Sequence, residues 1–386
     1  MKVSFGVPYL GPEEEQAVQN VIRSRWIGNG PQVKAFEKEL AEYVGAAHVV
    51  AVSSCTAALH LALLVSGVRP GDDVIVPAMT FCATAEAVRL CGARPVFADI
   101  DPETWLIDLQ SAEDCTTGYT SAIIPVHYAA SVVDMNRFRR LAANHGLRVI
   151  EDAAHAVGAL YPDGKRVGSL PDGITCFSFF PTKHIASPDG GALVWGEGLE
   201  ACESEVRFAQ LKALRHHGLR KDAFKQARTG QWVLSELVGD GYKYNWNDLA
   251  ASVARVQLRR QNELLTKRGE IFAAYDQVLE GMEGIQLQAE RGVRQWYYYV
   301  VKIDPAIYGP RDAIVAELMR RGVGCGVHYQ SLTAEPLYAR DWYGSCPVAE
   351  ELGARCLTLP VHPGMGADDV VFVLETFLDV LEGARR

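Results

Sequence analysis

The chain has 386 residues, of which 48% are hydrophobic and 22% are charged, as in an ordinary folded globular protein. Its 47 acidic and 38 basic residues give a net charge of −9, without any run rich in Lys and Arg. We therefore expect neither a nucleic-acid partner nor a membrane partner. The nine cysteines form no CxxC pair, which predicts reduced thiols and no metal site. The first residues lack an apolar signal segment, so we expect a cytoplasmic protein.

Short β-branched runs alternate with helical patterns over most of the first 200 residues. We predict strands at 48–52, 74–77, 95–98, 122–126, 148–151, 176–180 and 191–195. Helices are predicted between them at 56–65, 84–91 and 134–145. Buried strands separated by helices indicate βαβ units, so we expect an α/β fold whose central sheet is mostly parallel and covered by helices on both faces.

The pattern changes after about residue 200, where longer helical segments begin. We predict helices at 200–214, 247–282, 311–321 and 367–381, and strands at 297–301 and 324–328. We therefore interpret residues 1–245 as a large domain, and residues 246–386 as a connecting helix with a smaller C-terminal α+β domain.

Two carboxylates, Glu151 and Asp152, stand at the end of the predicted strand at 148–151. Ligands of a parallel sheet bind at the carboxyl ends of its strands, so an acid there can face a ligand. An aspartate in this position can hold a proton on the nitrogen of a heterocyclic ring. It can equally be a solvated strand end or the N-cap of a helix.

Lys183 follows the aromatic strand pattern at 176–180, after Pro181 interrupts it, and precedes the pair Gly190 and Gly191. A lysine on a loop is usually solvated. A lysine enclosed in a pocket loses part of its hydration, and its amine can then form a Schiff base with an aldehyde.

The small and hydroxyl residues from Ser53 to Thr56 connect the strand at 48–52 to the next helix. N–H groups and hydroxyls at a helix N-terminus suit a phosphate, although the same residues also form an ordinary N-cap. A lysine, an aspartate and a phosphate site together predict pyridoxal 5′-phosphate (PLP) as the cofactor, cycling with pyridoxamine phosphate.

Several short motifs support this interpretation, in the order 26–31 (WIGNGP), 54–59 (SCTAAL), 76–81 (VPAMTF), 125–128 (PVHY), 151–155 (EDAAH), 177–179 (FSF) with Lys183, 189–191 (DGG), 241–245 (GYKYN) with Asp248, and 359–364 (LPVHPG). Through them the chain resembles, over nearly its full length, the DegT/DnrJ/EryC1/StrS aminotransferases of nucleotide-linked keto sugars. The motifs PVHY and GYKYN are most similar to the branch that aminates C4 of a UDP- or dTDP-linked 4-keto sugar.

The resemblance implies a type I (aspartate aminotransferase-like) fold and a homodimer whose active sites are shared between subunits. In this family Lys183 looks like the catalytic Schiff-base lysine, and Asp152 looks like the partner of the pyridinium nitrogen. The other cofactor-binding residues that it implies are Thr56, Ala57 and Ser178 at the phosphate, Asn245 from the neighbouring subunit, Phe81 stacked on the ring, and His155 near the ring hydroxyl, where the family more often has glutamine.

The implied activity is transfer of an amino group, from L-glutamate, to C4 of a nucleotide-linked 4-keto sugar. The alternatives are amination at C3 of a 3-keto nucleotide sugar and a non-catalytic, PLP-binding regulatory protein. Retention of Lys183 and Asp152 favours the catalyst, and Lys183 argues against the dehydratase branch, which has histidine there. Candidate contacts to the sugar or diphosphate are His184, His328, Tyr329 and His362.

Overall fold

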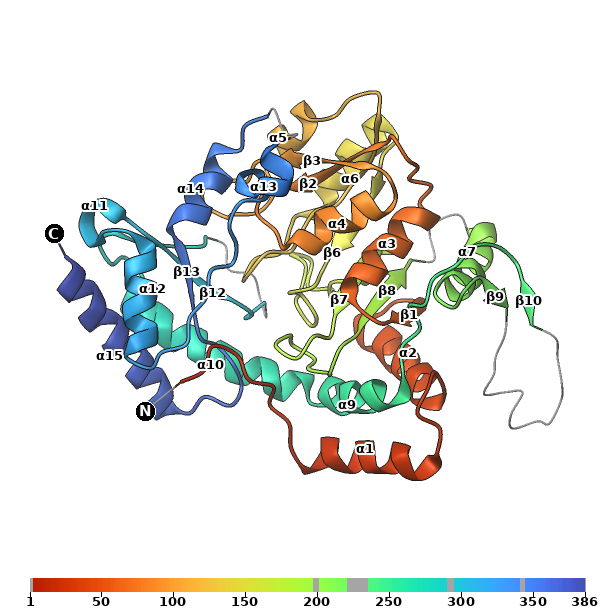
Figure 1. Cartoon of the computed structure of the whole chain (residues 1–386), viewed down its shortest axis with the longest axis horizontal. Coiled ribbons are helices and arrows are strands. Elements are labelled where there is room, and N and C mark those ends of the chain that lie inside the picture. The colour runs from red at the N-terminus through yellow and green to blue at the C-terminus, as the bar shows by residue number, and fades with distance from the viewer. Residues whose placement is uncertain (1–2, 197–200, 221–234, 290–294, 341–343, 386) are drawn as a thin grey trace.

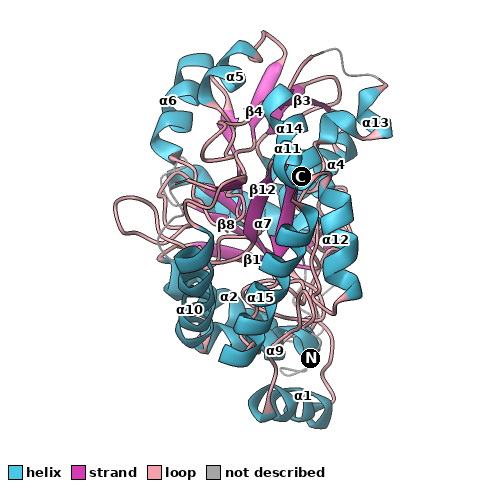
Figure 2. Cartoon of the chain, turned by 90° about the vertical axis from the view of Figure 1, so that its left-hand side faces the viewer, coloured by secondary structure: helices cyan, strands magenta, loops and turns pink. Residues whose placement is uncertain are grey.

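The computed structural model describes residues 3–196, 201–220, 235–289, 295–340 and 344–385. A central sheet occupies the larger part of the molecule, and a smaller antiparallel sheet lies in the C-terminal part, drawn in blue at the left of Figure 1. Viewed from the side, the strands run through the middle and most helices lie outside them (Figure 2). Within the described residues, no helix is both long and apolar enough to cross a membrane.

The central sheet is assembled from two four-stranded parts with the orders β3-β2-β4-β5 and β1-β8-β7-β6. Its strands are β1 (His48–Val52), β2 (Asp73–Pro77), β3 (Arg94–Ala98), β4 (Thr120–Ile123), β5 (Arg148–Val149), β6 (Glu151–Asp152), β7 (Ile174–Ser178) and β8 (Gly191–Trp195). Strands β2 to β7 pair in parallel, whereas β8 is antiparallel to both β7 and β1. The predicted α/β fold with a mostly parallel sheet is therefore confirmed.

The segment from Arg148 to Asp152 joins the two parts of this sheet, because it pairs with β4 first and with β7 afterwards. Between the two pairings, the Ile150 N–H donates to the Ile123 carbonyl at 3.0 Å. Beyond them, the Ala153 N–H donates to the Cys176 carbonyl at 2.9 Å. Asp152 is thereby held at the carboxyl end of the sheet, in the middle of the strand order.

The helices that cover this sheet come mostly from the first part of the chain: α2 (Pro31–Val44), α3 (Cys55–Val65), α4 (Cys82–Leu90), α5 (Leu109–Asp114), α6 (Met135–His145), α7 (Ala201–Leu214) and α9 (Asp248–Arg259). Helix α1 (Pro12–Ser24) packs on α9. Helix α3 packs on β7 and β8, while α2 packs on β1 and on α9. A short ribbon, β9 (Leu219–Arg220) with β10 (Glu236–Leu237), lies beside α7 (Figure 1).

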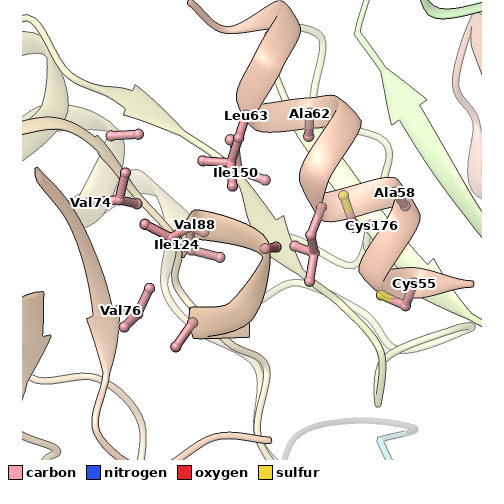
Figure 3. Close-up of a cluster of buried hydrophobic side chains, with 14 of the residues drawn as sticks. Cys55, Ala58, Ala62, Leu63, Val74, Val76, Val88, Ile124, Ile150 and Cys176 are labelled. Carbon is pink, nitrogen blue, oxygen red and sulfur yellow. The ribbon is translucent and has the colours of Figure 1, made fainter. Parts of the chain in front are cut away.

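Alternating strand residues bury the two faces of the sheet in separate cores, because successive side chains of a strand point to opposite sides. The core with α3 and α4 contains Val50, Val52, Val74, Val76, Cys176 and Leu193, several of which are labelled in Figure 3. The core with α2, α6 and α9 contains Val49, Ala51, Ile75, Phe177, Ala192 and Val194. Both faces are apolar, so these strands read as continuous hydrophobic runs in the sequence.

The C-terminal part contains the antiparallel sheet β11 (Ile285–Leu287), β12 (Tyr299–Ile303) and β13 (Cys356–Leu359). Its helices are α10 (Gln261–Leu279), α11 (Pro305–Tyr308), α12 (Arg311–Arg320), the 3₁₀ turn Leu332–Ala334, α13 (Pro336–Ala339), α14 (Pro347–Arg355) and α15 (Ala367–Ala384). A third core lies between this sheet, α10, α12 and α15. Cys346, Ala349 and Leu352, however, belong to the core of the first part. The division after residue 245 stays a prediction.

Two elements predicted from the sequence were wrong. The continuous helix predicted at 247–282 is two helices, α9 and α10, because the backbone of Arg260 turns away from helical angles (φ −89°, ψ 1°). The strand predicted at 324–328 is absent from the described structure, where only Gly326 of this segment forms an isolated bridge, with Thr358. Gly324 passes so close to the N-terminal segment that a Cβ on it would lie 2.4 Å from the Phe5 nitrogen.

Asp248 caps a helix that is far from it in the sequence. The residue before α2 is Gly30, which has no side chain to accept the first N–H groups of that helix. The buried Asp248 carboxylate accepts them instead, from Gln32 N and Val33 N, each at 3.1 Å. This cap fastens the N-terminus of α2 to the N-terminus of α9.

Asp248→Ala should lower the free energy of unfolding by about 1–2 kcal/mol, because two N–H groups of α2 lose their acceptor. Urea denaturation followed by circular dichroism measures this change. The matched control is Asp379→Ala, at an exposed position of α15, which should change stability by less than about 0.5 kcal/mol. Equal effects of the two substitutions would contradict the role given to Asp248.

Candidate active site

A cavity of about 300 Å³ opens at the carboxyl ends of β6 and β7, beside the first turn of α3. Position and size are those expected of a ligand site on a parallel sheet. The residues predicted from the sequence that line it are Thr56, Phe81, Asp152, His155, Ser178, Lys183, His328 and Tyr329. Segments more than 270 residues apart along the chain, from Ser54 to Tyr329, therefore meet in one pocket.

Asp152 is a buried carboxylate at the inner end of this pocket. Its Oδ2 accepts the Thr84 hydroxyl at 2.8 Å, and its Oδ1 accepts the Ala154 N–H at 3.1 Å. Burial raises the pKa of Asp152, while the hydrogen bonds from Thr84 and Ala154 and the charge of Lys183 oppose that rise. It forms no ion pair with a basic side chain among the described residues.

The N-terminus of α3 forms the opposite side of the pocket. Ser54 is the N-cap, and its hydroxyl accepts the Ala57 N–H at 3.1 Å. Ser54, Cys55 and Thr56 face the cavity at the positive end of the helix dipole. The strand β8 supports this turn so closely that a Cβ on Gly191 would lie 2.5 Å from the Cys55 nitrogen. An anion placed here would meet N–H groups of the first turn of α3.

Lys183 reaches the same pocket from the loop that follows β7. Its own N–H donates to the Phe180 carbonyl at 2.8 Å, which closes a tight turn after the strand. Its amine Nζ lies 4.6 Å from the ring centre of Tyr297 and 5.7 Å from that of Tyr298. Among the described residues, no carboxylate forms an ion pair with this amine.

His155 lies against an aromatic wall, with its ring centre 4.5 Å from that of Tyr297. Its Nδ1 accepts the Ala129 N–H at 3.4 Å, and its Nε2 is 3.2 Å from the Tyr329 hydroxyl. Burial, with the nearby charge of Lys183, lowers the pKa of His155 well below its usual value. A neutral ring whose Nδ1 accepts carries its proton on Nε2, so His155 can donate toward Tyr329 or toward a ligand.

His328 is held beside this wall by a contact of 2.9 Å between its Nδ1 and the Thr358 hydroxyl. Burial, and secondarily the charge of Lys183, lower the pKa of His328 to about 3. Phe81, at the start of α4, stands 5.7 Å from Tyr329 between ring centres, and 55% of it is exposed. The exposed ring of Phe81 therefore leaves room for a flat ligand to stack on it.

Four predicted residues do not line the pocket. Ala57 is buried in the first turn of α3, where its N–H is taken by Ser54. Asn245 pairs with Val52 at the end of β1, and its side-chain oxygen accepts the Lys243 amine at 2.5 Å. His184 is turned into the core against Tyr297, and His362 faces a small chamber behind the pocket.

Four further residues were not predicted from the sequence: Tyr298 in the pocket lining, the buried Thr84 that donates to Asp152, and the buried Tyr297 and Arg268. The three consecutive tyrosines 297–299 were visible, but they fitted the strand pattern that predicts core residues. Two of them precede β12, which begins only at Tyr299, and these two face the loop of Lys183. A run of three identical polar aromatics in a predicted strand was the available signal.

The pocket has groups that fit a phosphorylated pyridine aldehyde. Lys183 offers an amine to the aldehyde, the first turn of α3 with Ser178 offers donors to the phosphate, and the unpaired Asp152 carboxylate offers a counter-charge to a protonated ring nitrogen. In the described part of the chain, no group of three or more His, Cys, Asp or Glu side chains could hold a metal ion.

Comparison with known proteins confirms the resemblance seen in the sequence. The model of the DegT/DnrJ/EryC1/StrS aminotransferase family matches residues 8–378. The spore coat polysaccharide biosynthesis protein SpsC of Bacillus subtilis is 37% identical to the chain, with 98% of this chain and 97% of SpsC covered.

Solved structures agree with this chain over almost its whole length. Spr1654 from Streptococcus pneumoniae, named as a sugar aminotransferase, matches in its PMP form with a TM-score of 0.91 and 31% identity, over 99% of this chain and 100% of Spr1654. The aminotransferase TlmJ from Streptoalloteichus hindustanus matches with a TM-score of 0.88 and 32% identity, over 99% of each chain.

Asp152→Asn should make the cofactor-free protein more stable than wild type at pH 8, because the neutral amide avoids the cost of burying an ionised carboxylate. Because the folded pKa of Asp152 is raised, the unfolded carboxyl ionises first, and wild-type stability falls as the pH rises from about 4 to the folded pKa. The asparagine variant lacks this loss.

Urea denaturation at several pH values measures the effect. The control is Asp114→Asn, on the exposed end of α5, which should change stability by less than about 0.5 kcal/mol. If Asp152→Asn is less stable than wild type at pH 8, the ionised carboxylate stabilises the folded protein, which would contradict the prediction.

Proposed function

The chain belongs to the DegT/DnrJ/EryC1/StrS aminotransferase family, and from this premise we propose that it uses PLP to transfer an amino group from L-glutamate to C4 of a nucleotide-linked 4-keto sugar. The observation that carries the proposal is the single pocket shared by Lys183, Asp152 and the first turn of α3. A homodimer with shared active sites, in the cytoplasm, belongs to the same proposal.

The cofactor supplies an aldehyde for the amino donor and a pyridine ring that takes up the electron pair released when the neighbouring C–H bond breaks. Asp152 keeps a proton on the ring nitrogen, and its burial makes that pairing stronger than it would be in water. The donors of Thr56 and Ser178 hold the phosphate end. Lys183 presents its amine and moves protons as a general base.

Neutral aromatic and imidazole groups form the remaining wall. His155 can donate its Nε2–H at the edge of the pocket, while Phe81 can stack on the ring face. His328 and Tyr329 stand in the same lining and are our candidates for contacts to the sugar. His184 and His362 are weaker candidates, because both rings face away from this lining.

Lys183→Ala should fold normally, should lose the yellow absorption of the PLP-loaded protein, and should lower turnover by at least about 10²-fold, because the amine and the general base are removed together. The measurement is the visible spectrum before and after addition of L-glutamate, which should bleach the wild-type protein. Lys165→Ala, at an exposed loop position, is the control and should behave as wild type. A Lys183→Ala variant with near-wild-type turnover would refute the assignment.

A shared active site predicts complementation between two inactive variants, Lys183→Ala and Asn245→Ala. In an equal mixture with free exchange, half of the dimers are hybrids with one intact site, so about a quarter of wild-type activity should return. Exchange is followed by mass spectrometry of differently tagged subunits. Exchange without return of activity would exclude the assigned role of Asn245 from the partner subunit.

The position of amination is tested with paired substrates. A 4-keto and a 3-keto nucleotide sugar are each offered, together with L-glutamate as the amino donor, to the PLP-loaded protein, and NMR of the product locates the new amine. We expect turnover of the 4-keto sugar. Turnover of only the 3-keto sugar would favour amination at C3. If neither L-glutamate nor the amino-sugar product bleaches the yellow PLP absorption, a non-catalytic protein would be favoured.

A further inference from the structure

A buried phenol, Tyr297, lies directly behind the amine of Lys183. Its ring is 2% exposed, and its hydroxyl is 3.2 Å from the hydroxyl of Tyr298. It also borders a small chamber that is lined by Thr182, Arg268 and His362. The phenol therefore stands between the pocket that contains Lys183 and a second set of buried polar groups.

Arg268 is a buried cation in this second set. Its Nη1 donates to the Val361 carbonyl at 2.8 Å, and its Nε has no hydrogen-bond partner. In the described part of the chain it forms no ion pair with Asp or Glu. Burial lowers the pKa of Arg268 to about 10, although Tyr297 and Tyr298 favour its charged form. Its Cζ lies 5.8 Å from the ring centre of Tyr297.

The other titratable groups that face Tyr297 are neutral. His155 lies 4.5 Å away and His184 lies 5.1 Å away, between ring centres. Burial lowers the pKa values of His155 and His184 well below the usual value for histidine. Among the described residues, the charges beside the phenol are therefore two cations, Lys183 and Arg268, and a buried cation requires a nearby anion or strong acceptors.

The phenol of Tyr297 can supply the anion that the buried Arg268 requires, by losing its proton. Burial alone raises the pKa of Tyr297, but the charge of Lys183 and hydrogen bonds with Lys183, Tyr298 and Thr182 outweigh burial, so the pKa of Tyr297 lies below its usual value. The pKa of Tyr298 moves the opposite way, because of burial and the neighbouring Tyr297. Of the two adjacent hydroxyls, Tyr297 therefore loses its proton first.

We propose that Tyr297 is the proton-exchanging partner of Lys183, and that Arg268 stabilises its phenolate. In the forward step an N–H bond of the Lys183 ammonium breaks, the electron pair stays on Nζ, and an O–H bond forms on the Tyr297 oxygen. The reverse step returns the proton to Nζ, so no electrons or atoms are gained or lost. The inference rests on the proposed function only in taking Lys183 as the reacting amine.

The first test is a pH titration of tyrosinate absorbance in the near ultraviolet, on the full-length, cofactor-free protein. Wild type should ionise one more phenol than Tyr297→Phe below a pH of about 10, the usual value for tyrosine. Tyr275→Phe is the matched control, because it removes another buried hydroxyl, bonded to the Pro360 carbonyl, and should titrate as wild type. Identical titrations of wild type and Tyr297→Phe below pH 10 would overturn the proposal.

Three variants of the two cations distinguish charge pairing of Tyr297 from the effect of its burial alone. Lys183→Ala removes one cation, so ionisation of Tyr297 should move to higher pH. Arg268→Lys keeps a charge in the chamber and should preserve the titration step, whereas Arg268→Met should move it to higher pH. If Tyr297 ionises at the same pH in Lys183→Ala as in wild type, the proposed pairing of Tyr297 with Lys183 is overturned.

The PLP-loaded protein supplies the kinetic test. Removing a proton partner should lower the rate of bleaching by L-glutamate in Tyr297→Phe by about 10²-fold and shift the acid limb of its pH profile, with little change in the glutamate concentration that gives half of the maximal rate. Wild-type rate and profile in Tyr297→Phe would overturn the proposal. A protein with the tyrosinate step but no PLP absorption would overturn the proposed function while supporting the pairing of Tyr297 with Lys183.

Discussion

The site is arranged around one buried carboxylate, Asp152, that forms no ion pair with any cation in the described part of the chain. Asp152 is taken out of water and receives two hydrogen bonds, from Thr84 and Ala154, but no ion pair among the described residues. Burial of such a charge costs free energy in the unliganded protein. The sheet accommodates it because the segment from Arg148 to Asp152 pairs with strands on both sides, and its backbone cannot move to expose the side chain.

Two cations lie beside the aromatic rings of this site. The Lys183 amine lies near the rings of Tyr297 and Tyr298, and the Arg268 guanidinium lies near the ring of Tyr297. The same rings surround His155 and keep it neutral by excluding water. Charges among these buried rings interact through a medium of low polarity, so each charge affects neighbouring groups more strongly than it would in water. Proton positions in the pocket are therefore set by the protein and only weakly by bulk water.

The strands and their order along the chain were predictable, because both sheet faces are buried and the strands are short hydrophobic runs. The strand β8 at Gly191–Trp195 was predicted to the residue. The sequence did not predict the helix break at Arg260, which depends on a local backbone angle. It also predicted a strand around Gly324, where the close contact with Phe5 decides the backbone path instead. Neither feature is encoded by hydrophobic periodicity.

Local patterns and the order of the motifs in the sequence were enough to identify the family, the α/β class, an acid at the end of one strand and a lysine after another. The folded chain was needed to show that Asp152, Lys183 and the start of α3 share one cavity, that Asp248 caps α2, and that Tyr297 and Arg268 lie beside the lysine. The physical reason is that burial and charge pairing depend on distances between segments brought together by folding. In this chain those segments lie more than 270 residues apart, from Ser54 to Tyr329.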